Sequence, residues 1–158
     1  MTSAHQRLTG GCQCGAVRFA CESLDHASIC HCRMCQKAFG NVFSPMAAAH
    51  GLVWTRGNPK QFRSSNKAIR GFCGDCGTPM FYQVDGGEVE IAICALDDPS
   101  VAPPLLQVGT DSKIAWCDDL ASLPKRSADD LAKRAAFYES IISYQHPDHD
   151  TTDWKPRS

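Results

Sequence analysis

The sequence predicts a single, mainly β domain followed by one α-helix near the C-terminus. Three observations support this prediction. Much of the chain consists of short runs of β-branched, aromatic or alternating residues, separated by glycine, proline and aspartate. Ten cysteines stand in compact groups, a pattern typical of metal sites that tie short strands together. Only near the C-terminus do apolar residues recur at helical spacing.

The expected strands follow one another along the chain with clear turn signals. Residues 16–21 (AVRFAC) alternate, and residues 41–54 are apolar but broken by a proline and a glycine, which predicts one or two short strands. Residues 79–84 and 88–96 flank Asp-Gly-Gly, a strong hairpin signal. Residues 105–116 predict a further pair of strands around a Gly-Thr-Asp turn.

The expected helix begins after Ser127, which can cap it, and Asp130 follows at the position of an approximate capping box. Pro147 ends it. An apolar stripe of this kind needs a cover, and we expect the core of the same chain to provide it. The residues of the stripe are Leu131, Ala135, Tyr138, Ile141 and Ile142.

Composition and charge narrow the functional classes. The net charge is −1 and no basic run is present, so nucleic-acid binding is not expected. No apolar run approaches the roughly 20 residues that span a bilayer. The N-terminus lacks a signal-like apolar segment, so a cytoplasmic location is expected. Thiols stay reduced there, and metal binding becomes the leading explanation for ten cysteines.

Two matched turns predict one four-cysteine zinc site. Cys12 and Cys14 lie in GGCQCGAVRF, and Cys73 and Cys76 lie in FCGDCGTPMF. In both turns the last cysteine precedes a glycine, which allows the backbone to wrap a metal. Zinc in structural sites takes four such ligands. The alternative is that the second turn is a redox pair and the first is incidental.

Three further cysteines stand together in CHCRMC: Cys30, Cys32 and Cys35. Three thiolates can hold a zinc ion and leave its fourth position open to water or a thiol substrate. A metal-bound thiol loses its proton readily. The alternatives are a second structural site, with His31 or a distant residue as fourth ligand, and a reactive loop without metal.

Three cations flank the cysteine motifs: Arg33, Lys37 and Arg70. They are either solvated surface charges or a receptor for the carboxylates of an acidic peptide bound beside the metal.

Taken together, GGCQCGAVRF, CHCRMCQK, RGFCGDCGTPMF and ALDDP resemble the glutathione-dependent formaldehyde-activating enzyme family, which includes centromere protein V. Order and spacing match over roughly residues 9–124. The resemblance implies an Mss4-like, or β-tent, fold of small antiparallel sheets around a four-cysteine zinc. It also implies a second, more labile zinc on Cys30, Cys32 and Cys35. Many relatives carry a histidine in the strand where this chain has PPLLQVGTDSKIAW; no histidine is present there, and Leu105, Leu106 and Gln107 occupy the region.

We therefore expect a zinc-dependent carbon–sulfur lyase-type enzyme that condenses glutathione, or a related thiol, with formaldehyde to S-hydroxymethylglutathione. Arg33, Lys37 and Arg70 would contact glutathione, the co-substrate. The alternative is a non-catalytic zinc-binding scaffold or interaction module of the same fold. A small thiol and an aldehyde are the expected partners, without nucleic acid or membrane, and the chain is expected to be a monomer or homodimer.

The expected domain organisation has three parts: residues 1–8 form an N-terminal arm, residues 9–124 the zinc-binding catalytic domain, and residues 125–158 a C-terminal helix and tail packed on that domain.

Overall fold

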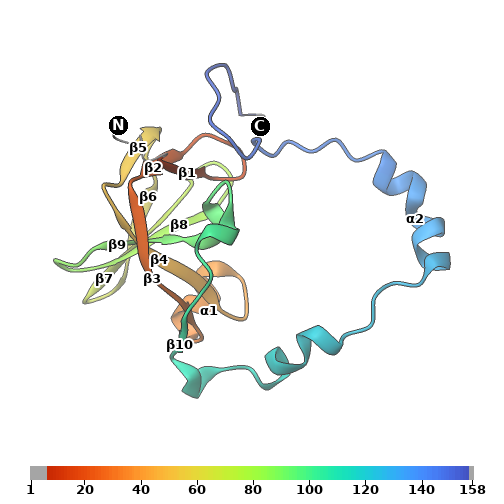
Figure 1. Cartoon of the computed structure of the whole chain (residues 1–158), viewed down its shortest axis with the longest axis horizontal. Coiled ribbons are helices and arrows are strands. Elements are labelled where there is room, and N and C mark those ends of the chain that lie inside the picture. The colour runs from red at the N-terminus through yellow and green to blue at the C-terminus, as the bar shows by residue number, and fades with distance from the viewer. Residues whose placement is uncertain (1–6, 157–158) are drawn as a thin grey trace, which may run out of the picture.

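Two β-sheets form the body of the protein, and a long C-terminal segment leaves the body and returns to it (Figure 1). The computed structural model describes residues 7–156. The strands are β1 (Leu8–Gly11), β2 (Arg18–Cys21), β3 (Ser23–Cys30), β4 (Ser44–His50), β5 (Val53–Arg56), β6 (Lys60–Ser65), β7 (Ala68–Phe72), β8 (Pro79–Val84), β9 (Val89–Ala92) and β10 (Leu106–Val108). The α-helices are α1 (Arg33–Phe39) and α2 (Ala128–Glu139).

The small sheet has the order β1-β2-β5, and the large sheet has the order β10-β3-β4-β9-β8-β7-β6. All pairs are antiparallel except β10 with β3, which are parallel at the edge of the large sheet. The mainly β prediction is confirmed. Among residues 7–156, no helix is long and apolar enough to cross a membrane.

The core lies where the two sheets meet. Every residue of β2 is buried, and Phe19 has no exposed surface. Trp54 of β5 contacts Phe19 edge-on and also contacts Phe81 of β8, in both cases with ring centroids 5.9 Å apart. Trp54 therefore joins the small sheet to the large one. Such aromatic contacts add about 0.5–1.5 kcal/mol each beyond the burial of area.

The sequence located several elements and missed others. Strands β2, β4, β5, β8 and β9 lie where they were predicted. The expected strand pair over residues 105–116 is wrong in its second half, because only residues 106–108 form a strand. Gly109 adopts a left-handed conformation, and short 3-10 helices follow at Thr110–Ser112 and Ala115–Ser122. The sequence did not predict β1, β3, β6 or β7 as strands, or α1 as a helix.

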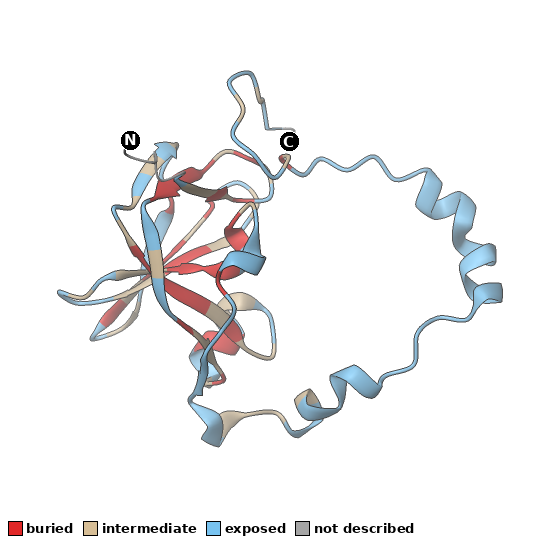
Figure 2. Ribbon diagram, in the orientation of Figure 1, coloured by how far each residue is buried: buried red, intermediate tan, exposed pale blue. Residues whose placement is uncertain are grey.

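Helix α2 begins after Ser127, where it was expected, but it ends at Glu139 rather than near Pro147, so Ile141 and Ile142 lie beyond it; nor does the helix pack on the domain. The Ser127 side chain accepts a hydrogen bond from the Asp130 amide at 3.1 Å, as the capping pattern predicted. However, every residue from 118 to 145 is exposed, and α2 lies away from both sheets (Figure 2). The expectation that this helix packs on its own domain is therefore corrected, because periodicity reveals an apolar stripe without specifying what covers it.

The tail beyond α2 does lie on the domain. The His146 side chain is buried, and its amide donates to the Gln13 carbonyl at 2.7 Å. The Trp154 indole donates to the Cys14 carbonyl, also at 2.7 Å. His146 and Trp154 pack edge-on, with ring centroids 5.0 Å apart. We call residues 146–154 the clasp, because they hold the end of the chain against the Cys12–Cys14 turn.

A buried arginine fixes the clasp from the other side. Arg18 is 3% exposed and makes two hydrogen bonds to Asp97, at 2.6 and 2.7 Å. It also donates to Asp150 of the clasp at 2.7 and 3.1 Å. Burial raises the pKa of the Asp97 carboxyl, but Arg18 outweighs that effect and holds this pKa below its usual value. A buried arginine needs such partners, so β2 and the clasp stabilise each other.

Replacement of Trp154 by phenylalanine should loosen the clasp, since the ring is retained and only the N–H donor to Cys14 is lost. A hydrogen bond of this kind contributes about 1 kcal/mol. Amide exchange at His146 should then accelerate about fivefold. Trp116→Phe is the matched control, because Trp116 is 53% exposed and lies outside the clasp. Equal exchange in both variants would show that the clasp does not depend on this bond.

Candidate functional site

Two turns that each end in a glycine bring four cysteines together. In one turn, the Gly15 amide donates to the Cys12 carbonyl at 3.0 Å; in the other, the Gly77 amide donates to the Cys73 carbonyl at 2.9 Å. Gly15 and Gly77 have φ angles of 76° and 77°. Residues with a Cβ avoid this left-handed conformation, which explains the glycine after each cysteine pair. The Gln13 amide donates to the Thr78 hydroxyl at 3.1 Å and joins the turns.

The sulfur atoms of these turns fit a tetrahedral zinc. The Sγ atoms of Cys12, Cys14, Cys73 and Cys76 all lie within 4.8 Å of one another. The Cys12–Cys14 distance is 3.6 Å and the Cys14–Cys73 distance is 3.8 Å. A tetrahedron with zinc–sulfur bonds of about 2.3 Å has sulfur–sulfur edges of about 3.8 Å. The donor set and its spacing are therefore suitable for zinc.

Three thiols of this group have shifted pKa values, and the shifts differ in direction. Burial raises the pKa of both Cys12 and Cys14. Burial also opposes ionisation of Cys76, but hydrogen bonds from Thr78 outweigh it and lower this pKa to about 6. The four thiols would therefore not all ionise on their own at neutral pH. A zinc ion held by these four sulfurs would supply the missing positive charge and favour the thiolate form of each.

The second group spans the end of a strand and the start of a helix. Cys30 ends β3, Cys32 is the N-cap of α1, and Cys35 lies within α1. Their Sγ atoms lie within 4.8 Å of one another. The Cys35 amide donates to the Cys32 sulfur at 3.4 Å, and amides of the first turn outweigh burial and lower the Cys32 pKa. Burial raises the pKa of Cys30 to about 12.

Strand β10 holds this cysteine loop in place. The His31 amide donates to the Val108 carbonyl at 2.9 Å, and the His31 ring bonds to the Gln107 side chain at 2.9 Å. A Cβ at Gly109 would lie 2.9 Å from the Cys32 amide nitrogen, so only glycine lets the strand approach this closely. The Gln36 side chain donates to the carbonyls of His31 and Ser112, at 2.7 and 3.0 Å. Gln107 therefore contacts the cysteine loop through the His31 ring.

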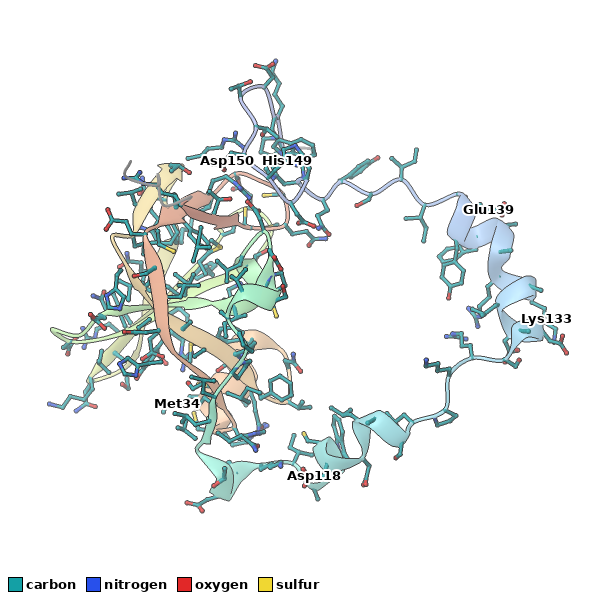
Figure 3. The ribbon with its side chains drawn as sticks, viewed as in Figure 1. Met34, Asp118, Lys133, Glu139, His149 and Asp150 are labelled. Carbon is teal, nitrogen blue, oxygen red and sulfur yellow. The ribbon has the colours of Figure 1, made fainter. Side chains whose placement is uncertain are left out.

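The three-cysteine group lies at one end of a pocket of about 500 Å³. This volume is within the usual range for small-molecule sites. Strands β3, β4, β8, β9 and β10 supply most of the wall, and α1 closes it with Met34 beside the cysteines. Met34 projects from the body of the protein near the start of the C-terminal segment (Figure 3). The four-cysteine group lines no part of this pocket.

Arg70 is the one predicted cation that lines this pocket. It is 4% exposed, and its Nη2 donates to the Cys35 sulfur at 3.1 Å. Its Nε donates to the Ser64 hydroxyl at 2.9 Å, and its guanidinium lies 4.8 Å from the centroid of the Tyr82 ring. Its Nη1 is buried and has no hydrogen-bond partner among the described residues. Arg70 therefore places a fixed positive charge against the cysteine group.

The other two predicted cations lie elsewhere. Arg33 is exposed and donates to the Gln36 side chain, outside the pocket lining. Lys37 is exposed and lines a second cavity, among phenylalanine side chains. The structure thus does not bring Arg33 or Lys37 to the three-cysteine pocket. Spacing in the sequence could not distinguish these two from Arg70.

Glu90 and Tyr82 are among the polar residues of the pocket that sequence reasoning missed. Glu90 and Tyr82 are paired across β9 and β8, and Tyr82 is paired with Arg70 across β8 and β7. The three side chains therefore lie in one row on the pocket face of the sheet. Burial raises the pKa of Glu90, although Arg70 opposes this effect. Their places within ordinary β-strands gave no signal of this role.

Comparisons with known proteins agree with this architecture. A family model described as glutathione-dependent formaldehyde-activating enzyme matches residues 7–112. The crystal structure of a Rhodobacter sphaeroides protein is similar, with a TM-score of 0.51 and 24% identity. The similarity covers 63% of this chain and 99% of that one. At this identity the likeness concerns the fold alone. The family match ends at residue 112, close to where the exposed C-terminal segment begins.

Cys73→Ser should remove one zinc ion and unfold the domain, because structural zinc contributes on the order of 10 kcal/mol to the folding of small domains. Elemental analysis and circular dichroism measure the two effects. Cys94→Ser is the control, since Cys94 is exposed and belongs to neither cysteine group. A folded Cys73→Ser protein with unchanged metal content would refute the four-cysteine assignment.

Proposed function

This chain belongs to the glutathione-dependent formaldehyde-activating enzyme family, and on that premise we propose that it condenses glutathione, or a related thiol, with formaldehyde in the pocket beside Cys30, Cys32 and Cys35. The product is S-hydroxymethylglutathione. The reaction is that of a carbon–sulfur lyase in the direction of synthesis.

One observation carries the proposal. Three sulfur atoms that suit zinc meet at the wall of a pocket, and a buried guanidinium donates to one of them. Three protein ligands leave a fourth position for a substrate, as in catalytic zinc sites generally. The four-cysteine group instead completes a tetrahedron by itself, which suits a structural role. We therefore assign two zinc ions, one to each group.

The reaction balances without any further reactant. The thiol gives up its proton, its sulfur attacks the carbonyl carbon, and a carbon–sulfur bond forms as the carbonyl π bond breaks. The carbonyl oxygen then takes up a proton to become the hydroxyl of the product. Zinc on the three cysteines supplies thiol deprotonation and positioning when bound.

Arg70 balances charge in this proposal. Three thiolates around a dication leave one net negative charge, and a thiolate substrate raises it to two. The Arg70 guanidinium, 3.1 Å from the Cys35 sulfur, offsets that charge at short range. Because Ser64 and Tyr82 hold it in place, its position does not depend on the substrate.

Glu90 is the proposed source of the proton. It lies in the pocket row beside Tyr82, and its raised pKa lets the carboxyl hold a proton at higher pH than an exposed glutamate does. In the reaction it would protonate the product oxygen and regain the proton released by the thiol. Positioned acids of this kind typically accelerate reactions by at least about a hundredfold.

Exchange NMR with labelled formaldehyde and glutathione tests the activity, with the spontaneous rate subtracted. Wild type should raise the exchange rate in proportion to its concentration. Cys32→Ala should stay folded, lose one of two zinc ions and show no acceleration, whereas Cys94→Ala should behave as wild type. If zinc-replete wild type leaves the rate unchanged, the activity is refuted; failure to bind glutathione as well would favour the scaffold alternative.

Arg70→Met should weaken glutathione binding, measured by calorimetry, by roughly 10- to 100-fold, since a charge-assisted hydrogen bond is worth about 1.5–3 kcal/mol. Lys37→Met should have no such effect, because Lys37 lies outside the pocket. Equal losses in the two variants would mean that general positive charge, rather than the placement of Arg70, governs binding.

A further inference from the structure

The C-terminal segment between β10 and the clasp, residues 109–145, extends from the body as a continuous arm (Figure 1). Lys133 and Glu139 mark its helix, α2, far from the sheets (Figure 3). Besides Tyr144, the arm carries eight large apolar side chains that are between 42% and 73% exposed: Trp116, Leu120, Leu123, Leu131, Phe137, Tyr138, Ile141 and Ile142. This is an unusual concentration of exposed apolar surface for one segment.

The helix itself requires a cover. α2 has 12 residues and buries none of them. Isolated helices of about 12–15 residues or fewer are marginal in water, because nucleation is costly and most helical stability in proteins comes from packing. The Ser127 cap contributes only about 1 kcal/mol. A stable α2 therefore needs an apolar surface that the described residues of its own domain do not provide.

We propose that the arm is the interface between two copies of this chain, packed about a two-fold axis with α2 against α2. The first argument is area. The eight side chains expose roughly 1,000 Å², whereas a stable interface of standard size needs about 800 Å² from each partner. The arm alone is thus large enough for a dimer.

The second argument is charge. Asp129 and Asp130 lie in the first turn of α2, and Lys133 and Arg134 lie in the next turn. When two such helices pack antiparallel about a two-fold axis between these turns, the acidic turn of each faces the basic turn of the other. A surface that is complementary to itself in this way favours a second copy over an unrelated protein.

The third argument is anchoring. The arm is fixed at its start by the pairing of β10 with β3 and at its end by the clasp. A segment held at both ends presents its apolar face in a restricted orientation, and this lowers the entropy lost when a partner binds. The proposal does not depend on the catalytic activity.

Sedimentation of the full-length, zinc-replete protein over a range of concentrations tests the interface. Wild type should form a species of twice the monomer mass. Leu131→Gln with Tyr138→Gln should raise the dimer dissociation constant at least about a hundredfold, because Leu131 lies next to the proposed axis and both copies lose apolar area from the same face of α2. Ala132→Gln with Ala136→Gln, on another face of α2, should change it less than about threefold. Glutamine is a good helix former, so the two double variants have closely matched helix propensity.

Amide exchange of wild type gives a second readout that needs no variant. The amides of α2 should be protected at concentrations where the dimer forms and should lose protection on dilution. A monomer at all concentrations overturns the proposal, and so does a dimer that tolerates the Leu131 and Tyr138 replacements. Protection of α2 that is independent of concentration would also overturn it, since the helix would then pack within one chain.

Discussion

The convergence of four sulfur atoms from two distant turns is the constraint on which the rest of the structure depends. The Cys12–Cys14 turn leads into β2 of the small sheet, and the Cys73–Cys76 turn joins β7 to β8 of the large sheet. Holding the turns together fixes the two sheets, and with them the Trp54 contact that fills the space between. The clasp also depends on the position of the Cys12–Cys14 turn, since Trp154 donates to the Cys14 carbonyl.

The two cysteine groups use the same ligand chemistry in different settings. In the first group, two turns that contain glycine surround the sulfur atoms, and the four cysteines supply all four ligands of a tetrahedral site. Around the second, a strand end, a helix cap and a helix residue present three sulfurs to a pocket, with a guanidinium as the neighbour of one. The first arrangement suits a metal that holds the fold. The second suits a metal that receives a substrate, because one side faces open space.

Features set by residues close together in the sequence were predictable, whereas features set by contacts between distant residues were not. The cysteine turns were predictable because glycine and cysteine at fixed spacing report local geometry, and the φ angles of Gly15 and Gly77 agree with it. The Ser127 cap was predictable for the same reason. Glu90 and Tyr82 were not, because their roles arise from strand register. Local patterns also could not show that Arg70 lies in the pocket while Lys37 lies outside it, or that one face of α2 is uncovered. Both features depend on tertiary contacts.

X-ray absorption spectroscopy at the zinc edge, with and without glutathione, tests the central claim most directly. Four thiolates at one zinc and three at the other give an average of about 3.5 sulfur ligands per zinc, and a glutathione thiolate in the open position raises it to about 4. That increase is the predicted result. An average that stays the same when glutathione is saturating, or that begins at four, would contradict the assignment of one closed and one open site.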